Sequence, residues 1–184
     1  FPLIIPDPHP FNFHNAWTYK DLSEPQFQVL KDFFARSLAI TCQKFQPDIV
    51  ECQHIWLFAE LVRQLKLPYI CVAHHSDQLG FLLDKRMQKL AIKAAHGAKY
   101  IFAVSSLVKE EVVKLYQVKP EKVKVIPNGF NQAVFKPQKL NKQQLFKQFK
   151  LPPLNLPLIT FAGRLSRTKG VDILLKANKI IQKE

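Results

Sequence analysis

Short apolar runs recur along the chain, and amphipathic stretches separate them. The runs are DIVEC (48–52), YICVA (69–73), YIFAV (100–104), KVI (124–126) and LITFA (158–162). Helical spacing of apolar residues marks stretches near 25–45, 55–66, 83–96, 107–116 and 141–149, and from 170 onward. Strands that are apolar throughout are typical of parallel sheets. The alternation therefore predicts an α/β fold with a mainly parallel sheet, covered by helices on both faces.

Single residues indicate where some of these elements begin and end. Gly97 stands where a helix C-cap glycine belongs. Ser105 or Ser106 can cap the start of the next helix. The sequence PNG (127–129) is typical of a turn, and the first 17 residues, rich in Pro, Asn and His, predict an irregular loop.

The charge of the chain indicates which partners to expect, and its cysteine content indicates the cellular compartment. The net charge is +13, and most of the lysines follow residue 60. They form either a solvated surface or a field that attracts phosphates and anionic lipid heads. No ribbon of interleaved aromatic and basic residues occurs, so nucleic acid is not an expected partner. Three cysteines (Cys42, Cys52 and Cys71) in apolar surroundings indicate free thiols and a reducing, cytoplasmic compartment.

The basic amphipathic stretch 83–96 has two interpretations. It can lie on an anionic membrane surface, which would make the protein peripheral to the membrane. The favoured alternative is an ordinary helix that packs its apolar stripe on the sheet and leaves its lysines in water.

The segment FAGRLSRTKGV (161–171) has the features of a phosphate-binding turn. Gly163 directly follows an expected strand and allows a ligand to approach the backbone closely. Arg164 can offer a planar fork to phosphate oxygens, and Lys169 adds a point charge. Arg167 either helps or faces solvent. Gly170 opens a helix whose free N–H groups and dipole favour an anion.

The segment CVAHHSD (71–77) carries histidines at the carboxyl end of an expected strand, where a cleft residue would lie. Only one of two adjacent side chains normally points into a given pocket, and we expect this to be His74 rather than His75. His74 is either a structural hydrogen-bonding group or a donor to a substrate hydroxyl. A zinc site formed by Cys52, His54, Cys71 and His74 is disfavoured, because the spacings do not match common zinc patterns.

Taken together, these segments resemble the family 4 retaining glycosyltransferases, which have the GT-B fold. The matching pieces, in family order, are PDIVECQH (47–54), YICVAHHSD (69–77), FAVSSLVKEEV (102–112), VIPNGFNQAVFKP (125–137) and FAGRLSRTKGVDILLKA (161–177). The second resembles the family's T-x-H-G-[ST]-D stretch, with His74 on the motif histidine. The last resembles its donor-phosphate motif, with Arg164 and Lys169 on the basic pair.

The resemblance implies two Rossmann-like domains with parallel sheets, of which only the first is largely present. Residues 1–127 would form the acceptor-side N-terminal domain, incomplete at its start. Residues 128–137 would be the crossover between domains. Residues 138–184 would be the first unit of the donor-binding C-terminal domain, truncated after it.

The resemblance also implies an activity: transfer of a hexose from a nucleotide-diphosphate sugar to an acceptor, with retention of anomeric configuration. His74 would be catalytic, and Gly163, Arg164 and Lys169 would bind the donor diphosphate. No cofactor and no obligatory metal are implied. We expect the 184-residue chain by itself to be inactive, because the second domain supplies most donor contacts in this family.

Several features depart from the family pattern. His75 stands where a glycine is usual, and Val72 where a threonine is common. The glycine-rich loop after the first strand and the Glu-x7-Glu segment are absent from these residues. Two alternatives therefore stay open: a GT-B-type sugar-nucleotide epimerase, which needs no acceptor, and a non-catalytic module that binds anions.

Overall fold

The computed structural model describes residues 17–137, 139, 141–151, 159–165 and 169–181. The chain divides into two compact units, Phe1–Gly129 and Phe130–Glu184. The crossover expected at residues 128–137 includes this division. The elements of the first unit are η1 (Tyr19–Asp21), α1 (Glu24–Phe45), β1 (Val50–Gln53), α2 (Leu57–Gln64), β2 (Tyr69–Ala73), α3 (Ser76–Leu83), α4 (Lys85–Gly97), β3 (Ile101–Ala103), α5 (Ser106–Tyr116), η2 (Pro120–Lys122) and β4 (Val123–Val125).

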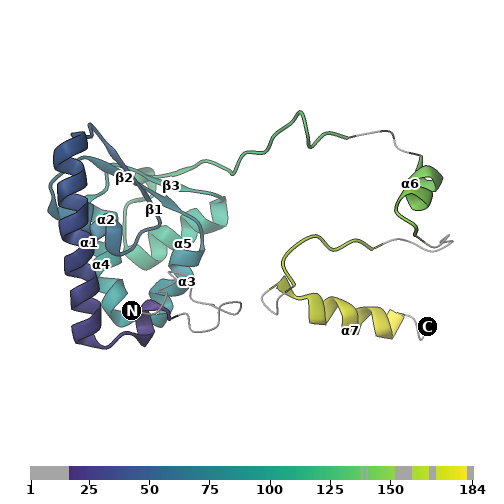
Figure 1. The fold of residues 1–184 in the computed structure, drawn as a ribbon, viewed down its shortest axis with the longest axis horizontal. Helices are drawn as coiled ribbons and strands as arrows, with labels where there is room; N and C mark the ends of the chain where they lie inside the picture. The colour runs from purple at the N-terminus through teal and green to yellow at the C-terminus, as the bar shows by residue number, and fades with distance from the viewer. Residues whose placement is uncertain (1–16, 138, 140, 152–158, 166–168, 182–184) are drawn as a thin grey trace. The chain divides into compact units, whose positions relative to one another are not determined.

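Strands β1 to β4 form a parallel sheet in the order β1-β2-β3-β4 (Figure 1). The register places Cys52 beside Cys71, Cys71 beside Ile101 and Ile101 beside Val123. This confirms the parallel sheet that the apolar runs predict, and β2 has the predicted bounds.

The described crossover helices α2, α4 and α5 belong to one face of this sheet. Each strand lies next to the preceding one in the same direction, so right-handed crossovers place all three helices on the same side. Along β2, Tyr69, Cys71 and Ala73 are accordingly buried, whereas Ile70 and Val72 are half-buried. Ile70 and Val72 help to line an open hollow of about 360 Å³ on the other face. The expectation of helices on both faces is therefore not met within the described residues.

Helix α4 packs very closely against the core, and Gly97 is part of the reason. The Tyr69 hydroxyl donates to the carbonyl oxygen of Ala94 at 2.6 Å. A Cβ on Gly97 would lie 2.5 Å from that hydroxyl oxygen and 2.7 Å from Cδ of Arg63. Gly97 is the last residue of α4 and Ala98, in extended conformation, is its C-cap. The sequence-based assignment of Gly97 as a C-cap was wrong: this glycine provides space, not a left-handed turn.

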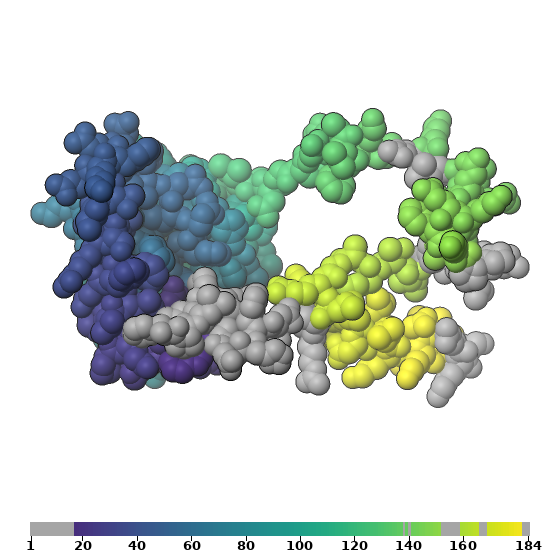
Figure 2. Space-filling view, viewed as in Figure 1, coloured from purple at the N-terminus to yellow at the C-terminus, as the bar shows by residue number. Residues whose placement is uncertain are grey.

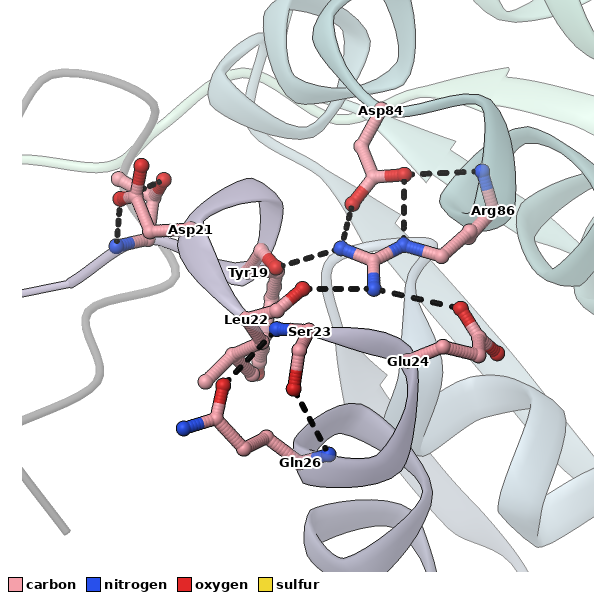
Figure 3. A network of polar contacts seen from close by, with 9 residues as sticks. Tyr19, Asp21, Leu22, Ser23, Glu24, Gln26, Asp84 and Arg86 are labelled. Atoms are coloured by element: carbon pink, nitrogen blue, oxygen red, sulfur yellow. Dashed lines mark hydrogen bonds and ion pairs between the residues drawn. The ribbon is translucent and has the colours of Figure 1, made fainter.

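Arg86 on α4 ties the beginning of the described chain to the core (Figure 3). Its guanidinium donates to the carbonyl oxygens of Tyr19 at 2.8 Å and Leu22 at 2.9 Å. It also pairs with Asp84 at 3.0 Å and lies 4.8 Å from the ring centre of Phe27. A planar guanidinium can serve several acceptors and an aromatic face at once. One side chain therefore joins η1 and α1 to α4.

Helix α1 runs along one side of the first unit, as the space-filling view shows (Figure 2). Ser23 caps its start: the Gln26 N–H donates to Ser23 Oγ, and the Ser23 N–H donates to Gln26 Oε1. In α5 the cap is Ser105 rather than Ser106, because Ser105 Oγ accepts the N–H of Val108 at 3.2 Å.

Helix α3 is an α-helix that the sequence did not predict. It directly follows β2 and contains Gly80, a residue that weakens a helix by roughly 1 kcal/mol relative to alanine. Gly80 is required here by packing, because the indole ring of Trp56 lies where its Cβ would be. Tertiary contact thus overrides the local signal against a helix.

In the second unit the structure describes α6 (Lys142–Gln148) and α7 (Val171–Ile181), and it thereby confirms both predicted helices. The strand expected at 158–162 is not formed: residues 159–162 have no strand pairing, and Leu158 lies outside the described residues. A strand needs a neighbour to satisfy its N–H and C=O groups, and the described part of this unit contains no other strand.

Candidate functional site

Polar residues follow β1 and β2 at the same edge of the sheet. His54 comes directly after β1, and His74, His75 and Asp77 follow β2. The backbone N–H of His54 donates to the Val72 carbonyl at 2.9 Å, so the two strand ends lie side by side. Ligands of open parallel sheets bind at the carboxyl ends of the strands, so this edge is the candidate site of the first unit.

Asp77 fastens the two strand ends together. Its side chain has no solvent exposure. One carboxylate oxygen accepts the backbone N–H of Ile55 at 3.1 Å, and the other accepts the backbone N–H of His74 at 3.1 Å. The indole N–H of Trp56 donates to the Asp77 carbonyl at 3.0 Å. The buried charge is thus hydrogen-bonded to both loops, as a buried carboxylate must be.

The backbone is left-handed at His54 (φ 72°) and at His75 (φ 74°). Such a conformation costs a non-glycine residue roughly 1–2 kcal/mol. His75 occupies the position where the resembling family usually has a glycine, which adopts this conformation freely. Strain of this kind is typical of functional sites, where the surrounding hydrogen bonds hold it in place.

The imidazoles of His54 and His74 lie against each other, with ring centres 5.1 Å apart. His74 Nε2 lies 2.6 Å from Oε1 of Gln53. An amide oxygen only accepts, so Nε2 of His74 carries the proton. His54 Nδ1 lies 3.5 Å from the Ser76 hydroxyl and 3.7 Å from the Asp77 carboxylate. The edge therefore presents a half-buried imidazole whose Nε2–H is held by Gln53.

His75 is directed elsewhere. Its Nδ1 lies 2.8 Å from a carboxylate oxygen of Glu111 on α5. The two adjacent histidines thus have different partners, which is the division expected for neighbouring side chains. The role of Asp77 was missed by sequence reasoning, although its position three residues after His74 is a signal for a loop-capping carboxylate.

The donor-phosphate residues expected from the sequence lie in the second unit. Gly163, Arg164 and Lys169 are exposed. Gly170 has φ 71° and its carbonyl accepts the N–H of Leu174 at 3.0 Å, so α7 starts directly after Gly170, as expected. Arg167 lies outside the described residues. The structure gives no relation between this motif and His74, because the two belong to different units.

Cys52 and Cys71 belong to the core rather than to this edge. They are opposite each other in the register of β1 and β2 and both are buried. The hydrogen bond with Cys52, together with burial, raises the pKa of the Cys71 thiol, so it stays protonated. Within the described residues no three His, Cys, Asp or Glu side chains gather in an arrangement that could hold a metal ion.

A parallel α/β sheet with polar residues at its carboxyl edge defines the chain as a Rossmann-like α/β protein. The model of Glycosyltransferase Family 4 matches residues 7–134. The chain belongs to this family.

Two curated relatives extend this result. An uncharacterized glycosyltransferase of Methanocaldococcus jannaschii is 25% identical over 192 aligned positions, covering 94% of this chain and 47% of the relative. The alpha-maltose-1-phosphate synthase of Mycolicibacterium smegmatis is 27% identical over 122 positions, covering 60% of this chain and 31% of that enzyme. The chain thus spans less than half the length of these relatives.

A solved structure supports the fold. The crystal structure of a glycosyltransferase from Rickettsia africae aligns with a TM-score of 0.59 and 20% identity, covering 89% of this chain and 43% of that one. This likeness is consistent with the Rossmann-like GT-B fold expected from the sequence. In the described residues, no helix has the length and apolar character needed to cross a membrane.

Proposed function

We propose that this chain is the acceptor-side part and the first donor-binding segment of a retaining glycosyltransferase that uses a nucleotide-diphosphate sugar. The family match over residues 7–134 carries the proposal, because it covers the whole candidate site of the first unit. The FAGRLSRTKGV motif adds a phosphate-binding segment outside the matched region.

Arg164 and Lys169 are proposed to hold the donor diphosphate. Both side chains are exposed and precede the start of α7, whose free N–H groups add to a positive field. Departure of the sugar leaves negative charge on the diphosphate, and cations already in place stabilise that charge. Gly163 would let the diphosphate approach the backbone.

His74 is proposed to face the sugar near the reacting carbon. Its Nε2–H is a fixed donor, currently bonded to Gln53, and its backbone is held by Asp77. On substrate binding, a sugar hydroxyl would replace Gln53 as the acceptor of this N–H while the glycosidic bond breaks through an oxocarbenium-like state. We expect the 184-residue chain to lack transferase activity alone, because transfer requires the donor to be clamped in a closed cleft between two domains.

The test uses the natural polypeptide that contains this chain, assayed with a panel of nucleotide-diphosphate sugars. Arg164→Gln with Lys169→Gln should lower kcat/KM for the donor by about a hundredfold or more, the usual effect of removing transition-state charge stabilisation. Lys179→Gln, an exposed lysine in the last turn of α7, is the matched control. Unchanged donor affinity and turnover in the double variant would refute the diphosphate assignment.

His74→Ala should lower kcat by about a hundredfold, as expected for a lost hydrogen-bonding or proton-transfer group. Normal turnover in a folded His74→Ala protein would reduce His74 to a structural residue. NMR identification of the anomer that forms first tests whether the anomeric configuration is retained. Epimerisation of the donor sugar in the absence of any acceptor would instead identify an epimerase.

A further inference from the structure

A second polar hollow lies at the opposite edge of the same sheet. It has a volume of about 700 Å³ and is lined mostly by residues that precede β3 and β4, together with His96 of α4 and Lys124 of β4. In a parallel sheet the amino ends of all strands share one edge, so this hollow lies across the sheet from His74. It does not depend on the proposed transferase activity.

The lining of this hollow is strongly basic. Four lysines contribute to it, together with His96 and a single carboxylate, Glu121. The four are Lys99, Lys119, Lys122 and Lys124. In the part of the chain that the structure describes, none of these lysines forms an ion pair with a carboxylate. Their positive charge is therefore concentrated around one concave surface without an internal counter-charge to match it.

Part of this surface is held rigidly. The Lys122 ammonium donates to the His96 carbonyl at 2.5 Å, and the His96 ring Nε2–H donates to the Tyr116 carbonyl at 3.0 Å. The Lys99 N–H donates to the Tyr69 carbonyl at 2.8 Å. These bonds anchor the lining, most of which lies in the loops before β3 and β4 and in η2, to α4, β2 and α5, which suits a preformed ligand site.

Lys122 shows the electrostatic cost of this arrangement. It is half-buried, and this burial lowers the pKa of its ammonium group. A bound anion would offset that cost by favouring the charged form. Tyr100, half-exposed at the rim, adds a hydroxyl donor and an apolar face.

We propose that this hollow, between the amino ends of β3 and β4, binds a phosphate monoester or diphosphate group. One carboxylate cannot balance the charge of several ammonium groups around one cavity. A phosphate carries a double negative charge and three strong acceptor oxygens, so it balances more of that charge. The volume is large enough for a phosphorylated small molecule or a phospholipid head group. Both sources share the same chemistry.

The soluble source is tested by titrating the 184-residue chain with pyrophosphate and following backbone amides by NMR. Arg164→Gln and Lys169→Gln are present throughout, so that the second unit does not compete. Saturable shifts are expected at Lys99, Tyr100 and Lys122. Lys119→Gln with Lys124→Gln, two exposed side chains, should weaken binding by about tenfold or more, since the loss of one charge-assisted hydrogen bond alone has about that effect.

The matched control is Lys85→Gln with Lys89→Gln, which removes the same charge from the exposed face of α4. The lipid source is tested by co-sedimentation with vesicles of phosphatidylcholine containing phosphatidic acid. Binding lost specifically in the Lys119/Lys124 variant, to either probe, supports the site and identifies the source. Absence of binding to both probes, or equal weakening by the α4 control, overturns it.

Discussion

The carboxylate of Asp77 accepts the backbone N–H of His74 at 3.1 Å, from a position without solvent exposure. The other carboxylate oxygen accepts the N–H of Ile55, in the loop after the neighbouring strand. One buried side chain therefore fixes the two loops that carry His54 and His74.

Asp77→Asn should destabilise the first unit by about 2–3 kcal/mol, because one of the two backbone donors would face an amide NH₂ instead of an oxygen. Urea unfolding followed by circular dichroism measures the change. Asp48→Asn, at an exposed position just before β1, is the matched control and should change the free energy of unfolding by less than about 0.5 kcal/mol. Equal stability of the two variants would contradict the fastening role of Asp77.

A second prediction concerns the left-handed backbone of His75. His75→Ala and His75→Gly both remove the imidazole and its contact with Glu111, so they differ mainly in backbone freedom. The glycine variant should be more stable than the alanine variant by about 1 kcal/mol, because only alanine is strained at φ 74°. Thermal or urea unfolding compares the pair.

His74 provides the control for this comparison. It is not among the residues with positive φ, so glycine there should be less stable than alanine. The same order of stability at both positions would show that strain does not distinguish them.

His74 and Asp77 also show how much of the candidate site could be predicted from the sequence. The apolar run of β2 fixed both its bounds and the position of His74 at a strand end, because strand burial is a local pattern. The contacts of Asp77 with Ile55 join residues 22 apart, and no local pattern specifies them. The prediction of a strand at 158–162 was wrong for a related reason. Strand formation depends on pairing with a neighbouring strand, which the apolar run itself does not supply.

A third prediction tests the close packing of α4. Gly97→Ala raises helix propensity, yet it should destabilise the first unit by about 1–2 kcal/mol, because the new methyl group would overlap the hydrogen-bonded Tyr69 hydroxyl. Arg63, the other neighbour, is hydrogen-bonded to Glu60 and is the same in both backgrounds. In a Tyr69→Phe background the same substitution should therefore cost less. A double-mutant cycle measures the coupling, and strict additivity would refute the contact.

A fourth prediction concerns pH. Burial raises the pKa of the Tyr19 phenol from 10.0 to about 12, because the charged form loses its hydration. A folded-state pKa above the unfolded value means that the stabilisation is fully present below pH 10 and is lost between pH 10 and 12. Relative to Tyr19→Phe, the wild-type chain should therefore lose about 1.3 kcal/mol of unfolding free energy between pH 9 and pH 11.

Urea unfolding of wild type and Tyr19→Phe at pH 9, 10 and 11 measures this loss. Subtracting the two unfolding free energies at each pH cancels the contributions of all other titrating groups. Tyr100→Phe, which alters a side chain 42% exposed, is the parallel comparison. Tyr19 packs edge-on against Trp56 at 5.8 Å between ring centres, and its backbone carbonyl accepts from Arg86. If the difference in unfolding free energy between wild type and Tyr19→Phe does not change with pH, the Tyr19 hydroxyl is hydrated in the folded chain. In that case η1 is held less firmly against α4 than these contacts indicate.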